Sequence, residues 1–314
     1  KMKPSGIRKF FDLAAMMEGV ISLGVGEPDF QTPWMVRKAA VDSLERKRMV
    51  YTANSGMMDL RKEICNYIQR KYQITYHSEH ETLVTVGGSE AIDLAIRAVV
   101  NPGDEVLVVE PSFVCYKPIV ELMHGVAVPI STKLENRFKL TAEELRSHIT
   151  ERTKLLILPY PNNPTGGIMT RKDLEAIAEV LRDTNILVLT DEIYSELTYG
   201  RKHVSIASID GMWERTIYVS GFSKAFAMTG WRLGYVCAPE PIAKQMLKIH
   251  QYAIMSAPTL SQYAAIVALR ECDKDVQKMV EEYNVRRRML VDGFNRIGLT
   301  CFNPEGAFYM FPCI

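Results

Sequence analysis

A lysine and an arginine eight positions apart carry the clearest chemical signal in the sequence. Lys224 comes shortly after a β-branched and aromatic run, residues 216–219, which predicts a buried strand. A desolvated lysine loses its charge readily, and its neutral amine can form a Schiff base with a carbonyl. Arg232 keeps its charge and suits a permanent anion such as a phosphate. The alternative is a surface lysine and a structural arginine, as in most such pairs.

Polar loops follow other apolar runs in the same way. Asp191 ends one such run and Tyr194 lies three residues later, whereas Asn163 and Phe113 follow two earlier runs. Each has a structural alternative: Phe113 as core, Asn163 as part of a turn, and Asp191 as a helix N-cap. Ligands of open α/β sheets bind at the carboxyl ends of the strands. The shared position at strand ends therefore favours one site.

A Gly-Gly-Ser sequence precedes a helical pattern in residues 89–100. Ser89 is typed as a helix N-cap, and the amides near Gly88 and Ser89 would be free at the helix N-terminus. Free amides and the helix dipole make an anion site. The alternative of a turn that binds nothing stays open at this point.

The elements that must position these residues alternate along the chain. Apolar runs predict strands and intervening apolar periodicity predicts helices, and the near-continuous apolar strands favour a mostly parallel sheet covered on both faces. The run 234–238 follows a turn too short for a crossover and is predicted to be antiparallel. The predicted strands are residues 82–86, 105–109, 154–158, 186–189 and 216–219, and the predicted helices include residues 58–72, 173–182 and 274–297.

Composition narrows the class of protein. The chain has 314 residues, of which 47% are hydrophobic and 24% charged, values that suit a globular protein of two domains. A net charge of +1 argues against nucleic-acid binding, and no apolar segment is long enough to span a membrane. The six cysteines and six histidines are scattered, which favours reduced thiols in the cytoplasm and no metal site. Residues 1–5 lack the apolar core of a signal peptide.

Residues 221–234 resemble, position for position, the pyridoxal-phosphate attachment site of class I aminotransferases. Almost the whole chain, from Leu23-Gly-Val-Gly-Glu-Pro-Asp to Gly306-Ala-Phe-Tyr, resembles the fold-type I branch that includes prokaryotic aspartate and aromatic aminotransferases. The resemblance implies a three-layer α/β sandwich around a mostly parallel, seven-stranded sheet. It assigns residues 34–273 to a large cofactor-binding domain, and residues 1–33 and 274–314 to a smaller α+β domain that is incomplete here.

The resemblance also implies roles for single residues. Lys224 would form the Schiff base with pyridoxal 5'-phosphate and then act as general acid and base, and Asp191 would hold the proton on the ring nitrogen. By the same resemblance the ring is held by Phe113, Asn163 and Tyr194, the phosphate by Gly88, Ser89, Ser223 (or Ser220) and Arg232, and the partner subunit's phosphate by Tyr51, while Gly26, Phe113 and Asn163 line the substrate site.

The implied activity is transfer of an amino group from an L-amino acid (aspartate, alanine or aromatic) to a 2-oxo acid such as 2-oxoglutarate, by a ping-pong mechanism. The implied assembly is a homodimer with shared active sites. One alternative is a C–S β-lyase, which uses the same lysine and cofactor. Another is a cofactor-binding regulatory module with an added DNA-binding domain, which the near-neutral charge disfavours.

Three departures from the family pattern bear on these expectations. Phe113 stands where many aspartate-preferring relatives have tryptophan, and Gly221 stands where the family often has serine. The family's arginine for the substrate α-carboxylate has no counterpart in the sequence. We therefore expect the gene to continue past Ile314 and to supply this arginine, together with partner strands for a strand predicted at residues 307–311.

Overall fold

The computed structural model describes residues 6, 10, 13, 16–21, 23, 24, 26–47 and 49–314. The expectation about a signal peptide in residues 1–5 lies outside the described residues, as do parts of the segment 1–33 assigned to the small domain. In the part of the chain that is described, no helix is both long and apolar enough to cross a membrane.

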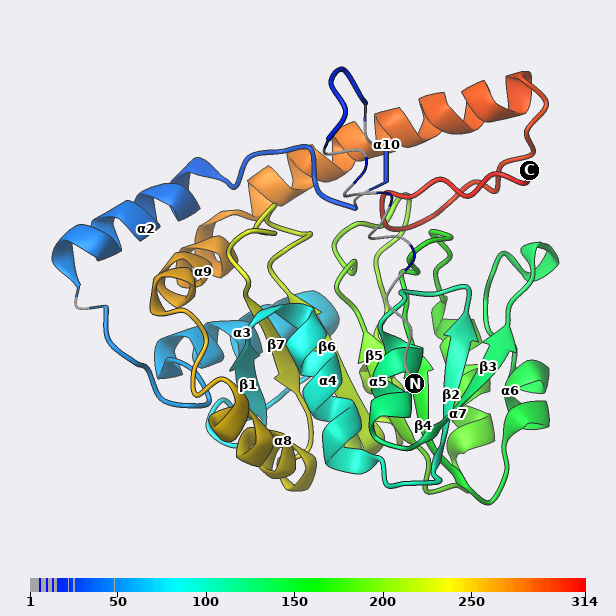
Figure 1. The fold of residues 1–314 in the computed structure, drawn as a ribbon, viewed down its shortest axis with the longest axis horizontal. Coiled ribbons are helices and arrows are strands. Elements are labelled where there is room, and N and C mark those ends of the chain that lie inside the picture. The colour runs from blue at the N-terminus through cyan, green and yellow to red at the C-terminus, as the bar shows by residue number, and fades with distance from the viewer. Residues whose placement is uncertain are drawn as a thin grey trace.

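A seven-stranded sheet in the order β1-β7-β6-β5-β4-β2-β3 forms the centre of the molecule (Figure 1). Neighbouring strands are parallel except at β7, which is antiparallel to both β1 and β6. The predicted mostly parallel sheet, with its one antiparallel strand, is thus confirmed. The strands are β1 (Thr82–Thr85), β2 (Glu105–Glu110), β3 (Val126–Ser131), β4 (Thr153–Leu158), β5 (Leu187–Asp191), β6 (Thr216–Gly221) and β7 (Gly234–Cys237).

Helices cover both faces of this sheet. The strands are apolar on both sides because their side chains alternate: Leu155 and Ile157 pack with α4, α5 and α8, whereas Leu156 and Leu158 pack with α6 and α7. The first face is covered by α4 (Gly87–Val99), α5 (Tyr116–Leu122) and α8 (Glu240–Ala253), and the second by α3 (Met58–Tyr72), α6 (Ala142–His148), α7 (Arg171–Leu181) and α9 (Thr259–Glu271). The result is the predicted three-layer arrangement.

Local sequence explains where several helices begin. Thr170 and Asp173 form a reciprocal capping box at the start of α7, and Thr141 and Glu144 do the same at α6. The helix predicted at residues 58–72 is α3, with the apolar periodicity facing the core. Among the described residues there are also two further α-helices and three short 3₁₀ helices: α2 (Trp34–Arg46), α10 (Asp273–Arg296), η1 (Leu134–Asn136), η2 (Ile206–Ser208) and η3 (Trp213–Arg215).

The long helix α10 and the C-terminal segment lie beyond the carboxyl ends of the parallel strands, at the top of Figure 1. The strand predicted at residues 307–311 is wrong, because these residues join no strand and only isolated bridges flank them, Thr198 with Gly306 and Cys301 with Pro312. A β-like run becomes a strand only when a neighbouring strand accepts and donates its backbone hydrogen bonds. The described residues supply none beside it.

Candidate active site

The candidate residues lie around the carboxyl edge of the sheet. Asp191 is the last residue of β5, Lys224 follows β6, and the Gly-Gly turn follows β1. Because β7 runs antiparallel between β1 and β6, its first residue, Gly234, reaches the same edge. Adjacent strands β5, β6, β7 and β1 therefore bring these segments together although they are far apart in sequence.

Lys224 is an amine whose charge is weakened by its surroundings. Burial lowers the pKa of Lys224 to about 8 from 10.5; Glu27 opposes this shift, Arg232 adds to it and Asp191 opposes it. The Nζ atom donates a hydrogen bond to the carbonyl of Gly26. It also lies 5.7 Å from the centroid of the Tyr194 ring. The lysine is thus more readily neutral than an exposed one, as the sequence predicts for this position.

Asp191 presents a buried carboxylate at the end of β5. The Tyr116 hydroxyl donates to its Oδ2 at 2.7 Å, and the Ile193 amide donates to its Oδ1 at 3.2 Å. Burial nonetheless raises the pKa of the Asp191 carboxyl, and the two hydrogen bonds only oppose that shift. A nearby cation would stabilise the ionised form.

Tyr194 and Gly26 lie beside Lys224. The Tyr194 hydroxyl is hydrogen-bonded to that of Tyr309 at 2.5 Å, and burial raises the pKa of Tyr194 well above its usual value, so it stays protonated. A side chain at Gly26 would collide with the Tyr309 hydroxyl. Gly26 is therefore a place of close backbone approach.

The turn between β1 and α4 forms a cradle of free amides beside a cation. The helix begins at Gly87, so Ser89 lies in its first turn and the prediction of Ser89 as N-cap is wrong. Gly87 has a φ of +79°, which glycine adopts without strain, so the chain turns into the helix at the two glycines instead of at Ser89. A Cβ at Gly87 would lie 2.6 Å from Arg232 Nη2, and one at Gly234 would lie 2.6 Å from the Gly88 amide nitrogen. We call residues 86–89 with Arg232 the anion cradle.

The two ring-holding candidates on the other loops are half-buried. Phe113 meets Tyr116 edge-on at 6.0 Å between ring centroids. The Asn163 side chain has no hydrogen bond among the described residues, whereas its neighbour Asn162 holds the loop by bonds to the Pro111 carbonyl and to Thr165. Asn163 is thus available to a ligand.

Other predicted residues divide between this edge and the surface. Ser223 is buried near Lys224, whereas the Ser220 hydroxyl is engaged with the Glu192 carbonyl at 3.3 Å. Tyr51 is 78% exposed, and its hydroxyl has no hydrogen-bond partner in the described part of the chain. The subunit itself does not bring Tyr51 into contact with the other site residues that the structure describes.

Sequence reasoning missed two tyrosines at the site. Tyr116 bonds Asp191 across 75 positions, and Tyr309 bonds Tyr194 across 115 positions. Tyr116 stands in the loop run that starts after β2, and Tyr309 in the Gly-Ala-Phe-Tyr motif. Their presence in these motifs was the only available signal.

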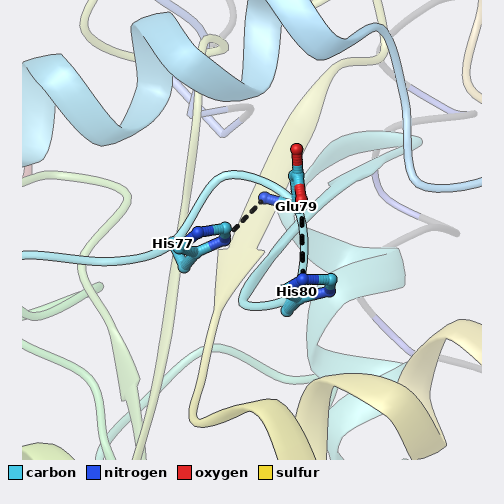
Figure 2. Close-up of side chains that lie close together, drawn as sticks. All are labelled: His77, Glu79 and His80. Carbon is cyan, nitrogen blue, oxygen red and sulfur yellow. Dashed lines mark hydrogen bonds and ion pairs between the residues drawn. The ribbon is translucent and has the colours of Figure 1, made fainter.

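A separate group of possible metal ligands precedes β1: His77, Glu79 and His80, all exposed (Figure 2). The two rings stack, with 5.0 Å between centroids and 10° between planes. Imidazole lone pairs lie in the ring plane, so parallel rings direct their nitrogens side by side rather than toward one ion. Because β1 runs parallel to β6, its start lies at the opposite edge of the sheet from Lys224. This group therefore has no part in the site.

Comparison with known proteins gives the family. The model of the family "Aminotransferase class I and II" matches residues 18–314. YugH of Bacillus subtilis (strain 168), assigned provisionally as an aminotransferase, is 52% identical, with 100% of this chain and 81% of that protein covered. The aspartate aminotransferase of Pyrococcus abyssi is 44% identical, with the same shares covered. The crystal structure of an aromatic aminotransferase from Pyrococcus horikoshii OT3 matches with a TM-score of 0.92 at 40% identity, covering 98% of this chain and 83% of that one.

These matches favour amino-group transfer over the lyase and the regulatory module, since the relatives and the solved structure are named for that activity. The fold, the lysine after β6 and the glycine turn after β1 agree with them. The chain belongs to the class I and II aminotransferase family and is an aminotransferase.

Proposed function

We propose that this aminotransferase uses pyridoxal 5'-phosphate and moves the amino group of an L-amino acid to a 2-oxo acid in two half-reactions. We also propose that it works as a homodimer in the cytoplasm, where its six free cysteines would stay reduced. The observation that carries the proposal is a lysine of lowered pKa placed at one sheet edge with a buried carboxylate and an anion cradle.

The described residues fit each part of the proposed cofactor. Glycine at residues 87 and 234 lets Arg232 and β7 approach the turn closely, so that free amides and a cation lie together, which suits a phosphate. Asp191 is a buried carboxylate whose pKa is raised by burial, and a protonated ring nitrogen would relieve that cost. Lys224 offers a readily neutral amine. When bound, the cofactor supplies an aldehyde for that amine and an electron-withdrawing ring.

The protein's own residues then divide the work. Asp191, held by Tyr116 and by the Ile193 amide, keeps a proton on the ring nitrogen. Tyr194 stays protonated, so its hydroxyl could donate a hydrogen bond to the cofactor ring. Lys224 Nζ accepts a proton from the substrate and returns it, for which a pKa of about 8 is well matched to neutral pH. Ser223 and the cradle hold the anionic end in place.

Amino acids and 2-oxo acids are the substrates of this activity. The relatives are named for aspartate and for aromatic amino acids, and we propose that the donor belongs to these classes. Phe113, half-buried and packed edge-on against Tyr116, would lie over the ring and contribute to the choice of side chain.

An exposed apolar face supports the proposed dimer. It comprises side chains of α2, of the segment that follows α2, of the last turn of α8 and of the α8–α9 connection: Trp34, Met35, Val41, Leu44, Met49, Val50, Tyr51, Tyr252, Ile254 and Met255. Hydrogen bonds from Asn54 to the Met255 carbonyl and from Thr259 to the Val50 carbonyl join these segments into one surface. Large exposed apolar surfaces mark protein interfaces. We propose that Tyr51 reaches from this face into the partner's anion cradle.

Replacement of Lys224 tests the cofactor proposal directly. Lys224→Ala should abolish both transamination and the borohydride-trapped bond between protein and pyridoxal phosphate, because the variant lacks the amine. Lys248→Ala, at an exposed lysine of α8, is the matched control and should trap cofactor normally. A cofactor bond that forms equally well in Lys224→Ala would refute the assignment.

A further inference from the structure

A buried pair behind the anion cradle is unused by the chemistry described so far. Glu90 lies in the first turn of α4 and His250 in the last turn of α8. Glu90 Oε2 accepts the Val86 amide at 2.5 Å, and Glu90 Oε1 lies 2.7 Å from His250 Nδ1. One carboxylate therefore connects the first residue of the cradle to a helix 160 positions away.

Burial determines which ring nitrogen of His250 holds the proton. The His250 side chain is 0% exposed, and its Nε2 has no hydrogen-bond partner among the described residues. An unpaired N–H in that position would cost more than an unpaired neutral nitrogen. The proton therefore sits on Nδ1, which donates to Glu90.

The pair acts on the geometry of the turn. Val86, Gly87, Gly88 and Ser89 stand at the start of the helix, where amides have no helical carbonyl to bond. Glu90 takes the Val86 amide, which leaves the other three free for an anion. Glu90 without His250 could rotate toward solvent or toward the anion, which it would repel. His250 therefore orients the Glu90 carboxylate, and the Glu90 carboxylate fixes the turn through the Val86 amide.

We propose that His250 is a positioning residue that, through Glu90, holds residues 86–89 in the conformation that binds an anion. The inference rests on the proposed function, since the cradle is the proposed phosphate site. It does not involve contact between His250 and any ligand.

The test compares two replacements of His250 in the full protein freed of cofactor. His250→Asn keeps a donor at the Nδ1 position, whereas His250→Leu fills similar space without one. Isothermal titration with inorganic phosphate should give a dissociation constant about tenfold larger for His250→Leu and within about twofold for His250→Asn, since a hydrogen bond to a charged group is lost only in the first. Should His250→Leu fail to fold, His250→Gln, whose amide reaches the Nε2 position instead, takes its place.

A double-mutant cycle tests whether the effect passes through Glu90. In a Glu90→Gln background, His250→Leu should change phosphate affinity by less than about twofold. Equal losses in His250→Leu and His250→Asn, or an unchanged loss in the Glu90→Gln background, would overturn the inference. Arg232→Leu separates the two proposals. If neither His250→Leu nor Arg232→Leu weakens phosphate binding, the cradle itself is wrong. If Arg232→Leu abolishes phosphate binding and His250→Leu leaves it unchanged, only the role of His250 is wrong.

Discussion

Burial drives the two central ionisable groups of the site toward their neutral forms. It raises the pKa of Asp191 and lowers the pKa of Lys224 to about 8. A cation that binds beside Asp191 would stabilise its carboxylate, and the neutral amine of Lys224 can react with a carbonyl. Tyr116 supports the first and the Gly26 carbonyl the second.

Asp191→Asn should leave cofactor bound and reduce kcat by about 10²–10³-fold, because an amide cannot balance a protonated ring nitrogen. Steady-state kinetics together with cofactor content would measure this. Tyr116→Phe is the comparison, because it removes only the supporting hydrogen bond. Its loss should be about tenfold. Near-normal turnover in Asp191→Asn would leave the residue a purely structural carboxylate.

Lys224→Met should stabilise the cofactor-free protein at pH 7 by about 1–2 kcal/mol, after allowance for the partial exposure of the side chain. The folded-state pKa of Lys224, about 8, lies below its unfolded value of 10.5, so below pH 8 the folded protein holds a charged amine at a cost. As pH rises from about 8 to 10.5, the unfolded chain binds the extra proton and the wild type gains stability.

The advantage of Lys224→Met should therefore shrink between pH 7 and pH 10. Urea unfolding at both ends of this range measures it, with Lys248→Met as the exposed control, for which a change under about 0.5 kcal/mol is expected. A constant advantage across the range would show that packing, rather than the lysine charge, is responsible.

At the scale of elements, the connection from β1 to α4 shows why glycines surround the cradle. Gly87 has a positive φ and lies against the Arg232 guanidinium, and Gly234 of β7 packs against the backbone of Gly87 and Gly88. Side chains at these positions would displace Arg232 or the backbone of the turn. The positive φ and the close approach of neighbouring atoms are separate requirements, and a second glycine of the chain can distinguish them.

Gly87→Ala should weaken phosphate binding at least tenfold, because its Cβ would lie 2.6 Å from Arg232 Nη2 and displace the cation. Gly103→Ala is the matched control, since Gly103 has a φ of +87° but open space around it. Both variants should lose about 1 kcal/mol of unfolding free energy from the strained φ. Calorimetry with phosphate would separate them, and equal affinities in the two variants would contradict the cradle.

At the scale of the whole molecule, the exposed apolar face includes Tyr51, which is 78% exposed, and Asn54 ties the segment after α2 to Met255 of the same face. A symmetric dimer would bury this face, and the Tyr51 of each subunit would then lie in the active site of the other subunit. Shared sites can be detected by mixing subunits that carry different lesions.

Lys224→Ala and Tyr51→Ala chains, each of low activity alone, should complement when refolded together. One site of each hybrid would then contain both lesions and the other neither. An equal mixture should recover about a quarter of wild-type activity, since half of the dimers are hybrids with one intact site. Hybrids seen by native mass spectrometry without regained activity would count against a shared site.

Local sequence was enough to predict the sheet, most of its strands, the helix α3 and the family. These features depend on periodicity and on short motifs, which reflect neighbours along the chain. Lys224 after an apolar strand and the Gly-Gly turn belong to the same class, because strand ends of a parallel sheet meet at one edge. The predicted N-cap of α4 and the predicted strand at residues 307–311 are wrong, since the residue at which a helix begins and the presence of a strand partner depend on the packed chain.

Only the tertiary structure decided which partners these residues have. Tyr116 reaches Asp191 across 75 positions, His250 reaches Glu90 across 160, and Lys224 reaches the Gly26 carbonyl across 198. Such contacts arise from the order in which strands and helices pack, and a single sequence holds no periodic or local record of them. Burial is equally a property of the packed molecule, and it lowers the pKa of Lys224 and raises the pKa of Asp191.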